Sequence, residues 1–202
     1  TLMNCHDFTH PVKEKLLINH RLKINLIGLS NSKKMLVQPE GINIDDWRDL
    51  LDNGRKTDLA EFTEEIASLN FRNSVFIDCT ASESVAGLYK KLFNSYVSVV
   101  TANKIACSSG FSLYRDLKST AQTRGVRFIF ETNVGAGLPV INTINDLINS
   151  GDRILEIQAV LSGTLNFIFN TISEKIPLSE TIRMAKEKGY SEPDPRIDLS
   201  GT

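Results

Sequence analysis

The sequence predicts an α/β fold in which a parallel sheet carries helices on both faces. Three short apolar segments, residues 75–77, 97–100 and 126–130, alternate with stretches of helical character. This rhythm of strand, helix and strand is typical of a parallel sheet. The first of these segments is apolar throughout, which is the pattern of a strand covered on both faces.

The composition is that of an ordinary soluble globular protein, since 41% of the 202 residues are hydrophobic and 23% are charged. This length allows one large or two small domains with a proper core. The net charge of −1 gives no electrostatic reason to expect nucleic acid or an anionic membrane as a partner. No apolar run approaches the length that spans a bilayer, and no signal peptide is visible.

The cysteines argue against a disulfide framework. Cys5, Cys79 and Cys107 are few, odd in number and widely spaced, which favours a reducing compartment, and the cytosol is the expected location. No cysteine and histidine cluster has zinc-binding spacing. All three histidines lie in the first twenty residues, which we interpret as a solvated polar segment.

Two kinds of sequence pattern predict the helices and the strand that precede residue 75. Residues 1–20 are expected to be helical with a break near Pro11. Residues 22–27 alternate apolar with polar side chains and then meet a glycine, which predicts a short strand. Residues 45–51 and 58–69 are predicted helices, each with an aspartate near its start as a cap or a partner for the helix dipole.

The predicted parallel strands each feed a helix. The strand at 75–77 leads to a helix that runs from Ser82, as its cap, to about Phe93. A helix from about 109 to 124 then connects the second strand to the third. The point where a strand ends and a helix begins is where an open α/β sheet binds its ligand.

The character of the chain changes near residue 133, so we place two domains at 1–132 and 133–202. The second opens with a helix over about 137–150, whose apolar face is formed by Leu138, Ile141, Ile144 and Ile148. Residues 153–161 alternate well enough to predict a strand of a second sheet. Two further helices follow, one after residues 162–164 and one over 179–188.

The last fifteen residues, KGYSEPDPRIDLSGT, form an unusual stretch. Gly189 lies where an amphipathic helix must stop, and two prolines then bias the backbone away from helix. If the segment is strand-like, its charged side chains fall on one side at a period of two: Glu192, Asp194, Arg196 and Asp198. Such positioned charges suit a small charged ligand, although an exposed acidic loop is the alternative.

Four motifs together resemble one known family. They are this last stretch, TANK at 101–104, ETNVGAGLPV at 131–140 and LSGTLNFIFN at 161–170. Through nearly all of its length, the chain resembles homoserine dehydrogenase. The resemblance implies a Rossmann-like parallel sheet that lacks its first strand and glycine loop, followed by the start of a second α+β substrate and dimerisation domain. It also implies truncation at both ends, because the family's catalytic aspartate and lysine are expected beyond Thr202.

The resemblance implies a function. The family interconverts L-homoserine and L-aspartate 4-semialdehyde with NAD(P), a step in threonine and methionine biosynthesis, and bifunctional members carry an aspartate kinase half. The fragment is expected to be inactive alone, and its parent enzyme is expected to be a homo-oligomer. Two alternatives stay open: a related nicotinamide-dependent oxidoreductase that acts on another small carbonyl compound, and a non-catalytic structural fragment.

The resemblance also assigns catalytic and substrate-binding residues. Lys104 matches a lysine beside the nicotinamide and substrate, where it would stabilise charge near the developing alkoxide. Glu192 would bind the substrate ammonium, and Asp198 would assist it. Thr164 would donate a hydrogen bond to substrate, or serve as an ordinary N-cap. Where the family usually has an acidic pair, this chain has Ile197 followed by Asp198.

Cofactor contacts are expected at three places. Thr80 and Ala81 would lie along the cofactor, and Gly189 would let the backbone approach it. A dinucleotide fold places an acidic residue for the ribose hydroxyls after its second strand, but this chain has none there. The hydroxyl, amide and ammonium groups that it has instead, Ser30, Asn31 and Lys33, favour NADP over NAD, with a plain polar turn as the alternative.

A monovalent cation such as sodium is a further expectation. The family binds one with Glu131 and with the carbonyl oxygens of Val134, Ala136 and Leu138, and oxygen ligands suit a hard cation. A helix N-terminus close by would oppose it. The same segment mimics a phosphate loop, but residue 140 is valine where that fingerprint needs glycine or alanine.

Overall fold

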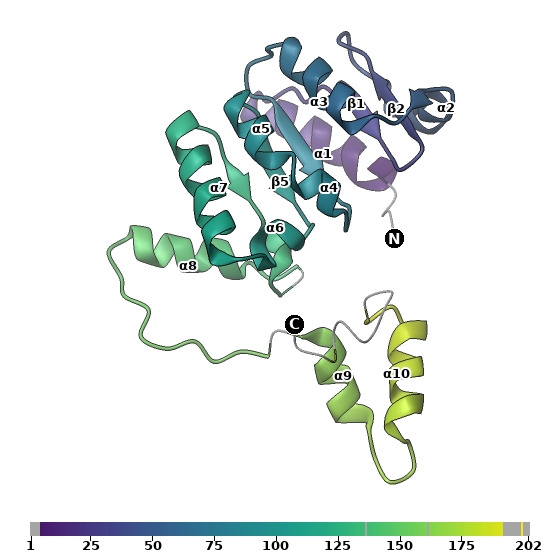
Figure 1. Cartoon of the computed structure of the whole chain (residues 1–202), viewed down its shortest axis with the longest axis vertical. Coiled ribbons are helices and arrows are strands. Elements are labelled where there is room, and N and C mark those ends of the chain that lie inside the picture. The colour runs from purple at the N-terminus through teal and green to yellow at the C-terminus, as the bar shows by residue number, and fades with distance from the viewer. Residues whose placement is uncertain (1–4, 136, 161, 192–198, 200–202) are drawn as a thin grey trace. The chain divides into compact units, whose positions relative to one another are not determined.

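A computed structural model describes residues 5–135, 137–160, 162–191 and 199 (Figure 1). The chain divides into two compact units, Thr1–Phe130 and Glu131–Thr202. Among the described residues, no helix is long and apolar enough to cross a membrane.

The first unit contains the predicted parallel sheet. Its strands are β4 (Val75–Asp78), β5 (Ser98–Thr101) and β6 (Phe128–Ile129), in the order β4-β5-β6. Both pairings are parallel, with Asp78 opposite Thr101 at the carboxyl ends of β4 and β5. The α/β fold class with a parallel sheet is therefore confirmed.

Two helices and the sheet form the main hydrophobic core. Helices α5 (Tyr89–Asn94) and α7 (Phe111–Arg124) pack against each other and against β5 and β6 (Figure 1). The rings of Tyr89 and Phe93 meet Phe128 edge-on, with ring centroids 5.8 and 5.5 Å apart. Burying rings of this size supplies much of the apolar stabilisation of a small domain.

The prediction that the first apolar strand is covered on both faces is wrong for β4. Phe76 packs into the core, but Val75 is 53% exposed and Ile77 is 67% exposed. Because alternate side chains of a strand point to opposite faces, the core covers only the face that carries Phe76. Among the described residues, no element buries the other face of this strand.

A second, antiparallel sheet was not predicted. It has the order β1-β2-β3, with the bounds β1 (Gly28–Ser30), β2 (Lys34–Val37) and β3 (Arg55–Lys56). The predicted strand over 22–27 is wrong, because those residues have no regular structure and the strand begins at Gly28 instead. The alternating apolar side chains before it are largely exposed, so no core selects that register.

Gly28 marks the point where this sheet meets a helix. Helix α3 (Leu59–Ser68) lies so close that a Cβ built at Gly28 would come within 2.9 Å of Ile66 and 3.0 Å of Phe62. The glycine therefore does not end the strand, as its place in the sequence suggested. It lets the strand pack against α3.

The starts of α2 (Trp47–Asp52) and α3 lie close to their predicted positions, but only one of the two has the predicted aspartate cap. Asp58 caps α3, since its Oδ1 accepts hydrogen bonds from the backbone N–H groups of Ala60 and Glu61. Asp46 precedes α2 without capping it. Helix α1 (Cys5–His20) runs without the predicted break, because one proline removes a single backbone donor and can bend a helix without ending it.

The helix predicted from Ser82 to Phe93 is two helices in the structure. Helix α4 (Glu83–Ala86) ends before Gly87, and α5 begins at Tyr89. Ser82 occupies the N-cap position, but its hydroxyl makes no capping bond and instead lies 2.8 Å from the hydroxyl of Ser84. Helix α6 (Ile105–Ser108) similarly precedes α7 as a separate short turn.

The second unit is helical wherever it has regular structure among its described residues. Its elements are η1 (Glu131–Asn133), α8 (Val140–Asn149), α9 (Gly163–Thr171) and α10 (Leu178–Glu187). Helices α9 and α10 pack side by side (Figure 1), and Ile168 and Ala185 are fully buried. The predicted strand over 153–161 is wrong in its described part, residues 153–160, where the chain is irregular. A strand needs a hydrogen-bonding partner, and no described segment supplies one there.

The contrast between the two aspartates gives a stability prediction. Asp58→Ala should lower the free energy of unfolding by about 0.5–2 kcal/mol, because two helix N–H groups lose their acceptor. Asp46→Ala is the matched control, and it should cost clearly less, since Asp46 accepts no helix N–H. Urea unfolding of both variants measures the difference. Equal losses would contradict the capping role.

Candidate active site

The first part of the site lies where β4 and β5 end. The two strands run in parallel and in register up to Asp78 and Thr101, so the segments that follow them leave the sheet at the same edge. Thr80 and Ala81 follow β4, and Lys104 follows β5. All three are exposed, and Lys104 directly precedes α6, where its carbonyl oxygen accepts the N–H groups of Cys107 and Ser108.

A buried polar cluster lies beneath these exposed residues. The Asp78 carboxylate accepts the Tyr89 hydroxyl at 2.6 Å, the Asn103 amide at 3.1 Å and the Thr80 N–H at 2.7 Å. The Thr101 hydroxyl lies 2.7 Å from that of Tyr89. These are the Asp78 cluster: Asp78, Tyr89, Thr101 and Asn103, each at most 3% exposed. A buried carboxylate is tolerated only with such hydrogen bonds.

Tyr89 acts in this cluster as a neutral hydrogen-bond donor. Burial raises the pKa of its phenol far above the ordinary value, and the hydrogen bond to Asp78 raises it further. The phenol therefore keeps its proton throughout the neutral pH range, and that proton is available to the carboxylate.

The sequence reasoning missed Asp78, Tyr89 and Asn103 as members of one cluster. A signal existed, because Asp78 directly follows a strand and Asn103 stands inside the TANK motif. Polar residues at the ends of neighbouring parallel strands are brought to one edge. Tyr89 gave no such signal, since its position on α5 reads as an ordinary apolar contact.

The residues predicted to select NADP form the turn of a β-hairpin. Ser30 is the last residue of β1, Asn31 and Lys33 lie between β1 and β2, and all three are exposed. The Asn31 Oδ1 accepts the N–H groups of Lys33 and Lys34, both at 2.8 Å, so the Asn31 side chain shapes the turn. Residues 30–34 include the Ser30 hydroxyl and the Lys33 ammonium group, and none of them carries a carboxylate. The structure thus shows a polar turn here, and a polar turn of this kind leaves room for the predicted contact with the 2′-phosphate.

The second part of the candidate site lies on α9 and α10. Thr164 is buried, and its hydroxyl donates to the carbonyl oxygen of Tyr190. The N-cap of α9 is Ser162, whose hydroxyl accepts from the N–H of Leu165, so the N-cap reading of Thr164 is wrong. Because its proton is already donated to Tyr190, the Thr164 hydroxyl has only its lone pairs left for a further hydrogen bond.

Gly189 ends α10 in the left-handed conformation, with φ of 71°. Its N–H donates to the carbonyl of Lys186, and the N–H of Tyr190 donates to that of Ala185, which is the Schellman pattern. A Cβ at Gly189 would meet no atom within 4 Å, so the backbone angle is what requires glycine here. The predicted helix stop at this residue is confirmed.

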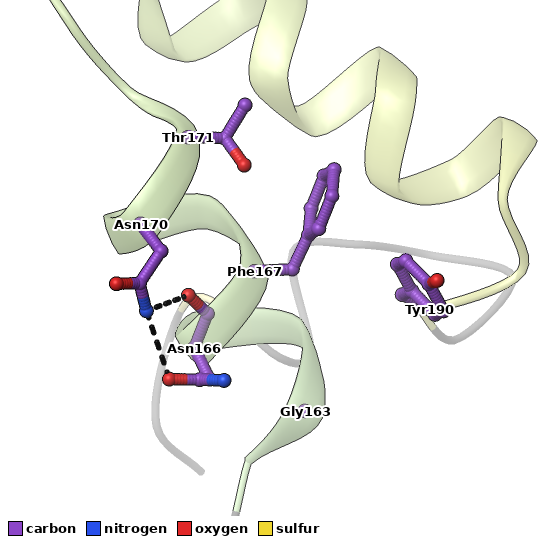
Figure 2. A pocket seen from close by; sticks show the side chains of 6 residues that line it. All are labelled: Gly163, Asn166, Phe167, Asn170, Thr171 and Tyr190. Atoms are coloured by element: carbon purple, nitrogen blue, oxygen red, sulfur yellow. Dashed lines mark hydrogen bonds between the residues drawn. The ribbon is translucent and has the colours of Figure 1, made fainter.

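A pocket of about 420 Å³ lies along α9, and Tyr190, which follows α10, completes its wall (Figure 2). Two aromatic rings of its wall, Phe167 and Tyr190, have centroids 5.1 Å apart. On the α9 side the Asn170 amide donates to the Asn166 carbonyl and side-chain oxygens, at 2.8 and 2.9 Å. The lining combines apolar and polar groups: Gly163, Asn166, Phe167, Asn170, Thr171 and Tyr190.

Glu131 has a structural partner. Its two carboxylate oxygens accept hydrogen bonds from the N–H groups of Ile141 and Asn142, at 2.9 and 2.8 Å. The carboxylate thus interacts favourably with the positive end of the α8 dipole. Across the described ranges no three His, Cys, Asp or Glu side chains form a metal-binding group. Val134 is half-buried, Leu138 is exposed and Ala136 lies outside the described residues, so the cation site stays a prediction.

Glu192 and Asp198, the predicted contacts of the substrate ammonium, also lie outside the described residues. Their roles stay predictions.

Comparison with known proteins decides the family. The family model described as "Homoserine dehydrogenase, NAD binding domain" matches residues 12–131, and the one described as "Homoserine dehydrogenase" matches residues 139–202. The chain belongs to the homoserine dehydrogenase family. Together the two matches cover most of both compact units of the structure.

Curated homoserine dehydrogenases are similar to this chain over nearly its whole length. It is 40% identical over 190 residues to the bifunctional aspartokinase/homoserine dehydrogenase of Haemophilus influenzae, covering 94% of the chain and 23% of that protein. It is 31% identical over 195 residues to the homoserine dehydrogenase of Schizosaccharomyces pombe, covering 93% and 52%. The chain thus spans about a fifth of the bifunctional relatives and half of the fission yeast one.

Solved homoserine dehydrogenases share its fold. A hyperthermophilic archaeal enzyme in complex with NADPH matches with a TM-score of 0.74 at 22% identity, over 94% of this chain and 60% of that one. The enzyme from Thermoplasma acidophilum matches with a TM-score of 0.68 at 20% identity, over 94% and 59%. The predicted Rossmann-like fold is therefore confirmed.

The end of α10 generates the second prediction. Gly189→Ala should lower the free energy of unfolding by roughly 1–2 kcal/mol, because a Cβ clashes with the backbone in the left-handed conformation. Gly163→Ala is the control: it is equally uncrowded, but its φ is not positive. Urea unfolding should show no loss for Gly163→Ala. Similar losses in both variants would show that the backbone angle is not the cause.

Proposed function

We propose that the natural protein with this sequence is an NAD(P)-dependent homoserine dehydrogenase. In the proposed reaction the C4 alcohol of L-homoserine loses a hydride to the nicotinamide ring and a proton from its hydroxyl, which leaves L-aspartate 4-semialdehyde. The observation that carries the proposal is the pair of family matches, in which one chain matches both the NAD-binding domain and the homoserine dehydrogenase domain. In the cell this step would serve threonine and methionine biosynthesis.

The residues at the ends of β4 and β5 fit a nicotinamide cofactor. Exposed Thr80 and Ala81 stand at the edge of the parallel sheet where this fold binds dinucleotides, with Lys104 after the neighbouring strand. The exposed Ser30 and Lys33 of the β1–β2 hairpin would hold the 2′-phosphate of NADP. When bound, the cofactor supplies the hydride acceptor, and the protein supplies position and charge.

Lys104 is the proposed catalytic residue of the first unit. The ammonium group of this exposed residue would stabilise the negative charge that develops on the substrate oxygen as the proton leaves. Its backbone is held by two α6 hydrogen bonds, so the side chain extends from a fixed point.

The second unit would bind the amino acid part of the substrate. Glu192 and Asp198 would face the ammonium group, and Gly189 would allow a close approach of the backbone. Thr164 fits a role as acceptor better than the predicted donor role, because its proton goes to Tyr190. An ammonium or hydroxyl group of the substrate is a suitable donor to it.

The natural protein is further proposed to be a homo-oligomer in the cytosol. Leu155, Ile157 and Val160 are 87%, 63% and 78% exposed on an irregular segment whose alternation suits a strand. Pairing of this segment in a sheet shared between two copies would bury them. The low cysteine count supports a reducing compartment.

The direct test is a spectrophotometric assay of the natural full-length protein with L-homoserine and NADP. It should produce NADPH in a homoserine-dependent manner. Glu192→Gln should raise the KM for homoserine roughly 10- to 150-fold, the equivalent of ~1.5–3 kcal/mol for a charge-assisted contact, and leave NADPH binding nearly unchanged.

The control for that variant is Glu187→Gln, which removes an exposed carboxylate that pairs with Arg183 at the end of α10. Its KM for homoserine should stay at the wild-type value. The assignment of Glu192 is wrong if the two variants behave alike, or if NADPH affinity falls as much as homoserine affinity. Absence of homoserine-dependent NADPH formation in the wild type would overturn the proposed activity.

Cofactor preference gives a separate prediction. Ser30→Asp should repel the 2′-phosphate and shift preference towards NAD. Lys33→Ala should weaken NADP more than NAD, with a difference that shrinks as salt rises, because exposed charges are screened. The measurement is kcat/KM for both cofactors at two ionic strengths.

Lys175→Ala, an exposed lysine between α9 and α10, controls for a general loss of positive charge. It should leave the ratio of NADP to NAD efficiency unchanged. If the ratio also stays constant in Ser30→Asp and Lys33→Ala, the adenosine phosphate does not bind at this hairpin.

A further inference from the structure

The side chain of Asn103 joins the segments that follow β4 and β5. Its Nδ2 donates to the Asp78 carboxylate at 3.1 Å and to the carbonyl oxygen of Ser82 at 2.9 Å. Its Oδ1 accepts the N–H of Ile105 at 3.1 Å. Asn103 is only 1% exposed, so these bonds are made away from water.

The hydrogen bonds of the Asn103 side chain form a bridge between two helix starts. Ser82 begins α4, because its carbonyl also accepts the N–H of Ala86 in the first turn. Ile105 begins α6. One amide group therefore connects the start of α4 with the start of α6. Both helices are single short turns, which have little stability of their own.

An asparagine side chain suits this position better than its close relatives. The bridge needs two donor hydrogens, for a carboxylate and a carbonyl, and one acceptor, for a backbone N–H. Aspartate would keep the acceptor but lose both donors, and it would place a second carboxylate beside Asp78. An apolar side chain would leave the carbonyl of half-buried Ser82 and the N–H of half-buried Ile105 with one partner fewer.

The other end of the bridge is anchored in the core. Asp78 closes β4, and its remaining hydrogen bonds come from Tyr89 on α5 and from the N–H of Thr80. The N–H of Asn103 donates to the Thr101 hydroxyl at the end of β5, at 2.9 Å. Asn103 is thus tied to two strands and a core helix, whereas its neighbours Thr80 and Lys104 face solvent.

We propose that Asn103 is a positioning residue of the cofactor site, which holds the Thr80–Ser82 turn and Lys104 in fixed relation to each other. This rests on the proposed function, in which those two segments bind NAD(P). Asn103 does not touch the reacting atoms. It acts through Lys104, which follows it directly, and through the turn that its amide holds. Because a displacement of about 1 Å can cost on the order of 100-fold in rate, this connection bears on kcat as well as on cofactor affinity.

The test compares Asn103→Asp with wild type in the natural full-length protein, with homoserine and NADP as substrates. At a temperature where circular dichroism shows both folded, kcat per folded enzyme should fall at least about 10-fold and the KM for NADP should rise. The KM for homoserine should change less.

Thr63→Val is the matched control. Thr63 is a buried residue of α3 whose hydroxyl donates to the carbonyls of Leu59 and Ala60, so the variant loses buried hydrogen bonds in the same unit. It should lower stability and leave kcat per folded enzyme unchanged. If Asn103→Asp does not fold, Tyr89→Phe replaces it, because the ring is retained and only the hydroxyl bonds to Asp78 and Thr101 are lost. Its kcat should fall about 2- to 10-fold.

The outcomes separate this inference from the proposed function. If the wild type is active and the kcat of each tested cluster variant matches that of Thr63→Val, Asn103 is merely structural and the inference is wrong. If the wild type is inactive with homoserine but binds NADPH, the proposed activity is wrong. The NADPH dissociation constants of the same variants, from fluorescence titration, then test the inference alone. A wild type that binds no NADPH overturns both.

Discussion

The buried carboxylate of Asp78 is the constraint on which the candidate site depends. It sits at the end of a parallel strand with almost no exposure, and it accepts hydrogen bonds from a side chain of α5, a side chain that follows β5 and the backbone of its own turn. A charge buried in this way is destabilising unless those donors stay in place. The cluster therefore fixes the edge of the sheet at which Thr80, Ala81 and Lys104 emerge.

The same arrangement connects folding with function in the first unit. The aromatic core of α5, α7 and β6 holds Tyr89, Tyr89 orients Asp78, and Asp78 with Asn103 holds the turns that are exposed for a ligand. Rigid support beneath exposed polar groups is what a site for positioning a cofactor requires, because a dehydrogenase gains rate mainly from orientation and charge. In the second unit the Schellman motif at Gly189 and the hydrogen bond from Thr164 to Tyr190 give α9 and α10 a comparable fixed geometry.

Sequence patterns predicted local features well where one residue type has one physical role. Gly189 at a helix end and Asp58 at a helix start are of this kind, and the apolar rhythm of 75–130 predicted the parallel sheet. They failed where a partner decides the structure. The alternation of apolar and polar side chains over 22–27 and 153–160 is typical of a strand, but neither segment has a strand partner among the described residues. The strand β1, which begins at Gly28, does have one. The family was readable from four motifs. The Asp78 cluster was only partly signalled, by Asp78 and Asn103 at the ends of neighbouring strands, because Tyr89 joins it only through the fold.

Hydrogen–deuterium exchange of the natural full-length protein, with and without NADPH, tests the central claim most directly. If the ends of β4 and β5 hold the cofactor, NADPH should slow amide exchange in peptides that cover residues 79–82 and 102–105. Peptides from the second half of α7, which packs against α5 and β6 and carries no proposed cofactor contact, should be unaffected. Binding of NADPH with unchanged exchange in both of the first two segments would contradict the account.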